Sequence, residues 1–340
     1  MNGMDIKTVR QTAKEKLKGY CRVCPVCDGK ACAGEVPGMG GIGTGASFRS
    51  NIEALKAFRL NMRTLHGAKN PDTTIELFGQ QLSTPILGAP ITGNPYNMGG
   101  ALTEVEWSEA AVQGCLQAGT FACTGDGADP AMYDSGLAEL KKVQGKGIPF
   151  IKPRGQEDIL KYLRRAEEAG AAAVGMDVDG AGLITMALKG QPVGPKTKEE
   201  MKEIIAATSL PFIVKGIMTV EEAVIAAEAG AAGIVVSNHG GRVLDHTPGA
   251  AEVLAEIAAV VKGRLTVFVD GGVRSGTDVL KMLALGADAV LIGRPLVIAA
   301  YGAGAEGIAL AINTMTNELK QAMILTGCAS LEDINMDVLL

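Results

Sequence analysis

Two short sequence patterns alternate along this chain, and their alternation restricts its fold more than any other feature. In the first pattern a helix-like stretch ends in glycine, small residues follow, and a β-branched or apolar run comes next. Its four copies are AGTFACT from Ala118, AGAAAVGMDV from Ala169, AGAAGIVVSN from Ala229 and LGADAVLIG from Leu285. Glycine can end a helix in the left-handed conformation, and the apolar run after it is typical of a buried strand.

The second pattern falls between copies of the first and predicts four more strands: TPILGAP from Thr84, IPFIKP from Ile148, LPFIVKG from Leu210 and LTVFVDGG from Leu265. A proline near the start suits the first position of a strand, where no ladder N–H is needed. Amphipathic stretches such as EDILKYLRRAEEAG lie between the strands and predict helices. Eight strands alternating with eight helices predict an α/β protein with a closed (β/α)8 TIM barrel, and a doubly wound open sheet is the alternative.

Residues 1–80 precede the first predicted barrel strand. They contain a helical start, a stretch rich in Cys and Gly, and a helix predicted around Ile52 to Leu65. No linker separates them from the rest of the chain. We therefore predict one structural domain, in which an N-terminal extension, 1–80, packs on a barrel formed by residues 81–340.

Composition and charge narrow the class of protein. Apolar residues make up 47% of the 340 residues and aromatic residues only 4%, which indicates an aliphatic core. A net charge of −5, with both signs interspersed, predicts no nucleic-acid partner. The most apolar stretch, Ala287 to Ala303, contains Asp288 and Arg294, so we predict no membrane span. A charged N-terminus without a secretory segment favours a cytoplasmic protein, whose seven cysteines are then thiols or metal ligands.

Polar and charged residues collect where the predicted strands end, at the edge of a (β/α)8 barrel that carries the active site. They are Pro90, Thr92, Thr124, Lys152, Asp179, Lys215, Ser237 to Arg242, Asp270 to Arg274, and Gly293 with Arg294. The motif SNHGGR places His239 directly after the buried run GIVV, which makes this histidine the candidate catalytic base. Arg242, three residues further on, is suited to a carboxylate held through two parallel hydrogen bonds.

Two glycine-containing loops follow the last two predicted strands, DGGVRSG from Asp270 and IGRP from Ile292. Barrels of this type often hold a phosphate there on backbone N–H groups. Gly271, Gly272 and Gly293 would let the backbone approach the phosphate, and Arg274 and Arg294 would add positive charge. Two such loops on consecutive strands predict a phosphate site.

These motifs also carry a family resemblance. SNHGGRVLDHTPGA, LPFIVKGIMTVEEA, VDGGVRSGTDVLKMLALGADAVLIGRP and MDVD resemble the FMN-dependent 2-hydroxy-acid oxidases and dehydrogenases, typified by glycolate oxidase and lactate oxidase. The resemblance is dense from about Pro211 to Tyr301 and looser from Ile75 to Asp179. It implies oxidation of a small 2-hydroxy carboxylate to the 2-oxo acid, FMN as cofactor, and a homo-oligomer, with a tetramer expected.

The resemblance further implies individual roles. His239 removes a proton from the substrate, Asp179 holds the imidazolium that forms, Arg242 binds the substrate carboxylate, and Lys215 offsets negative charge on the flavin. The residues implied to contact FMN are Pro90, Ile91, Thr124, Lys152, Asp177, Lys215, Ser237, Asp270, Gly271, Gly272, Arg274, Gly293 and Arg294.

The chain departs from the family pattern at several positions. The segment GGIGTGA from Gly40 lacks the tyrosine pair that the family usually has there. In FIKPR, Lys152 would replace a flavin-binding amide and Arg154 a substrate-facing tyrosine. Asp177 stands where the family has a flavin-facing Thr, and we expect it to pair with Lys152. The loop after the fourth strand is short, which makes oxygen doubtful as the electron acceptor.

A cysteine-rich run, CRVCPVCDGKAC, lies outside the resemblance. Cys21, Cys24, Cys27 and Cys32 follow the spacing C-x2-C-x2-C-x4-C and are candidate ligands of zinc or an iron–sulfur cluster. Reduced thiols or a redox disulfide are the alternatives.

Two other functions stay open. An FMN-dependent isomerase or lyase would share the barrel and the phosphate site but would lack the pairing of His239 with Arg242. A flavin-binding or thiol-based redox sensor would keep the phosphate site and lose nothing when His239 is replaced.

Overall fold

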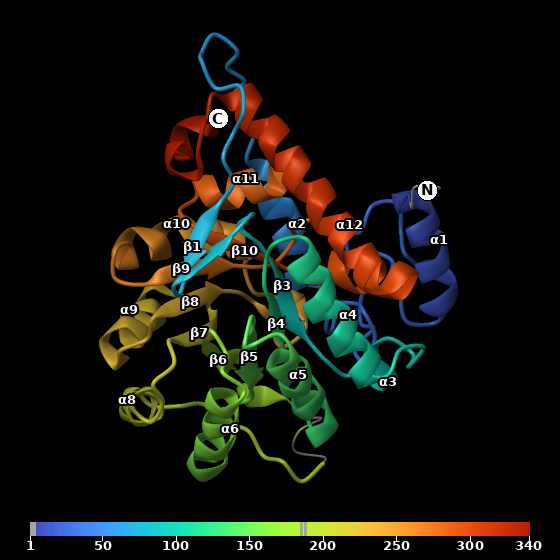
Figure 1. The fold of residues 1–340 in the computed structure, drawn as a ribbon, viewed down its shortest axis with the longest axis vertical. Coiled ribbons are helices and arrows are strands. Elements are labelled where there is room, and N and C mark those ends of the chain that lie inside the picture. The colour runs from blue at the N-terminus through green and yellow to red at the C-terminus, as the bar shows by residue number, and fades with distance from the viewer. Residues whose placement is uncertain (1–4, 184–185, 187–188) are drawn as a thin grey trace.

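The barrel predicted from the two alternating patterns is present and closed. The computed structural model describes residues 5–183, 186 and 189–340. Eight parallel strands form a ring in the order β10-β3-β4-β5-β6-β7-β8-β9 (Figure 1). They are β3 (Ile86–Ile91), β4 (Ala122–Thr124), β5 (Ile148–Ile151), β6 (Val174–Asp177), β7 (Phe212–Ile217), β8 (Gly233–Val236), β9 (Thr266–Val269) and β10 (Ala289–Ile292). All eight predicted strands are confirmed, and the pairing of β10 with β3 rules out the open sheet.

A helix follows each barrel strand. These helices are α4 (Glu104–Gln117), α5 (Pro130–Lys142), α6 (Gln156–Glu168), α8 (Lys198–Ala206), α9 (Val220–Ala229), α10 (Ala250–Val261), α11 (Gly276–Ala284) and α12 (Arg294–Thr326). Several of these helices begin with a capping box. The hydroxyl of the N-cap residue accepts a hydrogen bond from the backbone N–H of the third helical residue, and the carboxylate of that residue accepts one from the backbone N–H of the N-cap residue. Thr103 with Glu106 and Thr197 with Glu200 are two examples. Such caps stabilise a helix by about 1 kcal/mol and define where each crossover begins.

A β-hairpin plugs the barrel at the amino ends of its strands, a feature not predicted from the sequence. It consists of β1 (Ile75–Leu77) and β2 (Gln80–Leu82), which are antiparallel, and β2 leads within four residues into β3. Leu77 and Leu82 are buried in the inner core of the barrel, and the Phe78 ring lies 6.2 Å from the Phe268 ring. The hairpin leaves the opposite, carboxyl end of the barrel for the site.

The N-terminal segment packs on two sides of the barrel (Figure 1). Helix α1 (Ile6–Lys16) lies against α12, with Val9 and Ala13 buried between them. Helix α2 (Ala46–Ala57) packs on α10 and on the short helix η2 (His239–Gly241). The helix predicted over 52–65 is thus wrong in its bounds. From Phe58 the backbone is extended, and Arg59 accepts from the N–H of Leu340, because this segment pairs with the C-terminus. The boundary at residue 80 stays a prediction.

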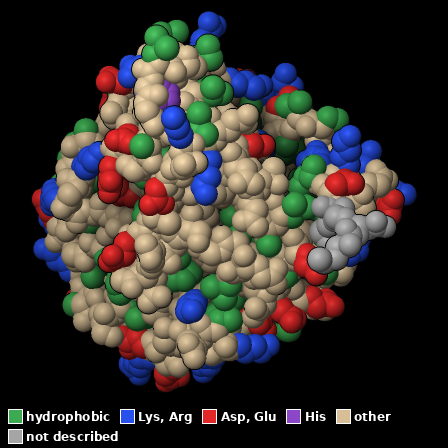
Figure 2. Space-filling view, turned by 45° about the horizontal axis from the view of Figure 1, so that its top comes forward, with side chains coloured by type: hydrophobic (Ala, Val, Ile, Leu, Met, Phe, Trp, Pro, Cys, Tyr) green, Lys and Arg blue, Asp and Glu red, His purple; other side chains and the backbone are tan. Residues whose placement is uncertain are grey.

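The remaining short helices are α3 (Asn94–Asn97), η1 (Val178–Gly182), η3 (Leu331–Asp333) and η4 (Met336–Val338). Helix α12 is long and apolar enough to cross a membrane, but 56% of its most apolar window is buried in the protein. It is kinked at Ala303 and Gly304 and covers the barrel beside α4. On the face shown in Figure 2, basic and acidic side chains are interspersed, in keeping with the charge pattern of the sequence.

Candidate active site

Strand register places two lysines and two aspartates together at the carboxyl end of the barrel. Asp177 is directly beside Lys215, and Lys152 follows the residue beside Met176. The Lys152 ammonium lies 2.6 Å from one Asp177 oxygen, and the Lys215 ammonium lies 3.3 Å from the other. Lys215 is also 3.7 Å from a carboxylate oxygen of Asp270. The predicted pair of Lys152 and Asp177 is therefore confirmed as part of a larger buried network.

The network keeps its members charged. Burial disfavours the ammonium of Lys215, but Asp177, Asp179 and Asp270 outweigh this effect and hold the pKa of Lys215 well above its usual range. Burial likewise disfavours the Asp177 carboxylate, and the two lysines reverse the effect and hold the pKa of Asp177 well below its usual range. The site thus presents a fixed cation, Lys215, that is only 3% exposed.

His239 is held by Asp179 across the same end of the barrel. Its Nδ1 lies 2.9 Å from Asp179 Oδ1, and its backbone N–H donates to the Ser237 hydroxyl. Burial opposes ionisation of Asp179, yet His239 and Lys215 lower the pKa of this carboxyl. An ionised carboxylate on Nδ1 leaves Nε2 as the ring nitrogen that can take a proton and stabilises the imidazolium that results.

Glycine at position 216 makes room for this pair. Gly216 follows Lys215 with φ of 104°, and a Cβ there would lie 2.5 Å from Cβ of Asp179. Only glycine combines that conformation with such a close approach. The residue after Lys215 therefore leaves the space that the Asp179 side chain occupies.

Arg242 lies at the same end of the barrel, and no acidic residue within the described ranges pairs with it. Its guanidinium donates to the backbone carbonyls of Gly38 and Gly40 and to Asn97 Oδ1. Burial lowers its pKa to about 10, so it remains a cation at neutral pH. A buried cation that is satisfied by neutral acceptors alone is suited to binding an anionic ligand.

Arg274 and Arg294 form a second basic group at the ends of β9 and β10. With Gly272 they line a cavity of about 440 Å³, within the usual range of about 300–1,000 Å³ for small-molecule sites. The Nε atom of Arg274 is buried without a hydrogen-bond partner. Burial, with Arg242 and Arg274 nearby, lowers the pKa of Arg294. The unsatisfied donor and the uncompensated charge fit the phosphate group of FMN, so these residues suit the cofactor implied by the resemblance.

The structure shows a packing requirement for glycine at positions 271 and 272, which the sequence did not predict. Gly271 and Gly272 have φ of 97° and 83°, and a Cβ on either would collide with Asn51 of α2. Their small size lets α2 pack against this loop, and their predicted contact with a phosphate stays a prediction. A Cβ built on Gly293 would meet its nearest neighbour, the end of the Ile91 side chain, at 3.8 Å. The space beside Gly293 is therefore open, as predicted for a residue that a phosphate approaches. Ser237 donates to Asp270 at 2.6 Å, which places these two predicted FMN ligands together.

The structure corrects the prediction that Thr124 contacts FMN. Its neighbour Cys123 lies in the inner core of the barrel, and side chains alternate along a strand, so Thr124 points outward. A Cβ on Gly136 of α5 would lie 2.8 Å from the Thr124 hydroxyl oxygen. Its side chain therefore faces a helix and not the carboxyl end of the barrel. Pro90 and Ile91 do end β3 as predicted, and the Ile91 carbonyl accepts from Trp107 Nε1 at 2.9 Å.

The structure also corrects the prediction that Arg154 faces the substrate. Its guanidinium forms a bidentate ion pair with Asp126 and also donates to Gly127 O and Gln191 Oε1. The side chain is 5% exposed, so its donors are used within the protein and do not reach a substrate carboxylate. The sequence analysis did not predict a role for Asp126. This residue comes two residues after a predicted strand end, so the search for polar residues at strand ends could have identified it.

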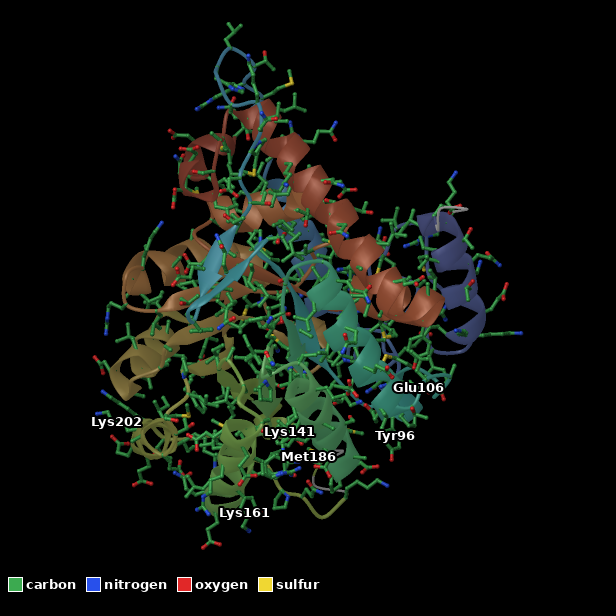
Figure 3. The ribbon with its side chains drawn as sticks, viewed as in Figure 1. Tyr96, Glu106, Lys141, Lys161, Met186 and Lys202 are labelled. Carbon is green, nitrogen blue, oxygen red and sulfur yellow. The ribbon has the colours of Figure 1, made fainter. Side chains whose placement is uncertain are left out.

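Asn97 and the loop after β6 complete the mouth of the site. Asn97, which binds Arg242, lies on α3, and no sequence signal identified it. Gln191, in the loop after β6, donates to the Ala128 carbonyl at 2.6 Å, so this short loop crosses to the β4–α5 connection. Tyr96, labelled in Figure 3, is exposed beside it, with the Lys189 ammonium 5.9 Å from its ring centre.

The cysteine-rich segment lies beside the basic group. Cys21, Cys24, Cys27 and Cys32 all line one small cavity together with Arg294, and all four are free thiols. In the described part of the chain, the metal-ligating atoms of three residues approach within 4.8 Å of one another only at Asp177, Asp179 and His239. Those carboxylates already face two lysines, which disfavours a metal ion there. None of the described cysteines belongs to such a group, and the predicted zinc ion or iron–sulfur cluster stays a prediction.

Comparison with known proteins shows the family to which the chain belongs. A family model for FMN-dependent dehydrogenases matches residues 38–192 and 181–340. The 4-hydroxymandelate oxidase of Amycolatopsis orientalis is 35% identical over 332 residues, which cover 86% of this chain and 89% of that protein. The L-lactate oxidase of Lactobacillus jensenii is 33% identical over 320 residues, covering 85% and 76% of the two chains. The glycolate oxidase of Spinacia oleracea is 32% identical over 329 residues, covering 85% and 86%.

Solved structures show the same fold. A crystal structure of mandelate oxidase superposes with a TM-score of 0.80 at 30% identity and covers 100% of this chain and 98% of that one. Mandelate oxidase with (S)-2-phenylpropionate gives 0.77 at 31% identity, with the same coverage. The matched family ranges begin at residue 38, so the four N-terminal cysteines lie outside them.

Proposed function

This chain belongs to the FMN-dependent family of 2-hydroxy-acid oxidases and dehydrogenases, and from that premise we propose that it oxidises a small 2-hydroxy carboxylate to the 2-oxo acid with His239 as the base. The observation that carries the proposal is the contact of 2.9 Å between His239 Nδ1 and an ionised Asp179. It stands at the barrel end where, in the described part of the chain, Arg242 lacks an acidic partner.

Each residue then has a chemical task. Arg242 exchanges its carbonyl and amide acceptors for the substrate carboxylate and so orients the carbon that carries the hydroxyl. Nε2 of His239 takes the proton, and Asp179 stabilises the positive ring. Bound FMN supplies the electron sink for this oxidation. Lys215, held charged by three aspartates, places a fixed positive charge among the residues predicted to contact the cofactor.

The cofactor tail would be held by Arg274 and Arg294 in the cavity that they line, with Ser237 and Asp270 on the way to it. Lys152 and Asp177 would contact the flavin as a buried pair, in place of the family's amide and hydroxyl. We further propose a cytoplasmic homo-oligomer, a tetramer by family resemblance, which light scattering of the purified protein tests.

Anaerobic reduction of the bound flavin tests the function. Purified protein is mixed with a panel of 2-hydroxy acids, and loss of flavin colour is followed by stopped flow. We expect one or more acids to bleach the wild type and His239→Asn to be slower by a factor of about 10²–10⁴ at unchanged FMN content. Arg242→Lys should bleach mainly at higher substrate concentration, because a lysine cannot form the two parallel bonds.

The control separates chemistry from cofactor loss. His246→Asn changes an exposed histidine in the same loop and should bleach like wild type. If His239→Asn bleaches as fast as wild type on every acid that works, or if the protein binds no FMN, the assignment is wrong.

A further inference from the structure

The four N-terminal cysteines are gathered around one cavity, although the proposed reaction has no use for them. Cys21, Cys24, Cys27 and Cys32 line it together with Arg294, Met39 and Ile298. Each is partly buried and unbridged. Four thiols from twelve consecutive residues surround a shared space, as a single bound group requires.

The positive charges of the arginines beside this cavity favour an anionic group in it. In the part of the chain that the structure describes, Arg242, Arg274 and Arg294 form no salt bridge with a carboxylate. Their donors go to carbonyls, to an amide oxygen and to sulfur. Arg274 Nη2 lies 3.5 Å from Cys27 Sγ. Thiolates that ligate a metal group in this cavity would therefore lie beside Arg294 and Arg274, where positive charge favours them.

The spacing of the sulfur atoms decides the kind of group. Around one zinc ion, with Zn–S bonds of about 2.3 Å, neighbouring sulfurs lie about 3.8 Å apart. Among the described residues no three cysteine sulfurs lie within 4.8 Å of one another. A polynuclear cluster, in which each thiolate binds a different metal atom, holds its ligands further apart than one zinc ion does, and the run C-x2-C-x2-C-x4-C is close to the ligand run of a ferredoxin.

The loop that carries the cysteines is held at several points. The Val23 N–H donates to Cys21 Sγ at 3.4 Å, and Arg10 donates to the Cys24 carbonyl at 2.6 Å. Val23 has φ of 46°, an unfavourable value for a β-branched residue, which persists where surrounding contacts over-determine the backbone. The Phe48 ring packs against Gly29 and lies 3.8 Å from the Arg294 guanidinium. The loop is therefore docked against the basic group.

We propose that Cys21, Cys24, Cys27 and Cys32 bind a four-iron iron–sulfur cluster, one thiolate to each iron, with Arg274 beside Cys27 and Arg294 in the wall of the cavity. The four cysteines precede the residues that the family model matches, which begin at residue 38. It does not depend on the proposed reaction, since cluster binding and hydroxy-acid oxidation are measured separately.

Metal and sulfide analysis of the full chain tests the proposal. The protein is purified anaerobically, reconstituted with ferrous iron and sulfide, and assayed for iron, acid-labile sulfide, zinc and FMN. We expect about 4 iron and about 4 sulfide per chain, and a low-temperature paramagnetic resonance signal on reduction with dithionite. Less than about 0.2 iron per chain would overturn the proposal, as would stoichiometric zinc without sulfide.

Variants locate the ligands. Cys24→Ser and Cys27→Ser should each lower the iron content at least about fivefold with FMN content retained, whereas Cys328→Ser, which changes a buried cysteine outside the cavity, should match wild type. Equal iron in Cys27→Ser and wild type contradicts the assignment.

Alkylation of the wild type gives an independent measurement if a variant fails to fold. Four cysteines should become reactive toward iodoacetamide only after a chelator removes the iron, and immediate labelling of Cys24 and Cys27 in the iron-loaded protein contradicts the site. Failure of cluster binding in a protein that still bleaches with hydroxy acids removes this inference alone. An iron-loaded protein that no hydroxy acid bleaches removes the proposed function alone.

Discussion

At the residue scale, the site depends on buried charges that compensate one another. Asp177 is 1% exposed and contacts the ammonium groups of both Lys152 and Lys215. Removing one member of a buried ionic network is more costly than removing an exposed pair, because the remaining charges lose their compensation. Asp177 joins the two lysines, so its loss leaves Lys152 without a carboxylate and Lys215 with only the weaker contact to Asp270.

We therefore expect Asp177→Asn to lower the free energy of unfolding by about 3–5 kcal/mol at pH 7, measured by urea denaturation. The pKa of Asp177 is depressed in the folded protein, so its contribution is fully present above the unfolded pKa of about 3.9 and is lost as the pH falls below that value. The difference between wild type and variant should thus be constant from pH 7 to about pH 5 and shrink in stronger acid. Lys161→Gln, in an exposed pair on α6, should change stability by less than about 1 kcal/mol. A difference that grows on acidification contradicts the argument.

At the scale of the element, the strand ends and the turns after them position the catalytic groups. β7 ends with Lys215, Gly216 and Ile217, and the register with β8 shifts there. η2 begins with His239 at φ of 56°, followed by Gly240 and Gly241 with φ of 62° and 76°. A Cβ on Gly241 would lie 2.3 Å from the backbone nitrogen of Phe48, so α2 approaches the turn through that glycine. The imidazole orientation is therefore a property of packed elements.

Gly216→Ala tests this argument. The new methyl group would press on Asp179, so we expect anaerobic flavin reduction to slow by at least about 10²-fold, with FMN content retained, as misplaced catalytic groups do. Gly263→Ala is the matched control, because Gly263 also has a positive φ, 78°, but no atom within 4 Å of its Cβ position. Both variants should lose a similar backbone contribution to stability, of about 1 kcal/mol. Equal flavin-reduction rates in the two variants would contradict a positioning role for Gly216.

At the scale of the whole molecule, the N-terminal segment and the barrel share one set of contacts. α1 packs on α12, α2 packs on α10, and residues 58–61 pair with the C-terminus. Leu17 is fully buried at the end of α1, as part of the same core that surrounds the barrel. From these contacts we expect the N-terminal segment and the barrel to unfold as one cooperative unit, so the single domain stays a prediction that unfolding can test.

The fluorescence of Trp107, the one tryptophan, reports on unfolding of the barrel from α4. Leu17→Ala should lower the stability seen by this probe by about 2–5 kcal/mol, the usual cost of emptying a buried leucine site. Ile6→Ala, at a position 39% exposed on the same helix, should cost much less. An unchanged Trp107 transition in Leu17→Ala would show that the extension unfolds separately from the barrel.

The sequence alone determined the barrel and the chemical types at its rim. Each βα unit carries its own strand, helix and turn signals, and a parallel strand's carboxyl end is known once the strand is recognised. His239 with Asp179 and Lys152 with Asp177 were predicted as pairs, and the structure brings both together. The bounds of α2 and the β1–β2 hairpin escaped prediction, because short segments without strong periodicity are ordered by what they pack against.

Only the tertiary structure decided which way a side chain points and with what it pairs. Thr124 faces α5 because its neighbour Cys123 fills the barrel interior, and Arg154 is taken by Asp126, 28 residues away along the chain. Gly271 and Gly272 serve the packing of Asn51, which no local pattern shows. The physical reason is common to all three: a local sequence specifies conformation and polarity, whereas partners depend on the register and packing of distant elements.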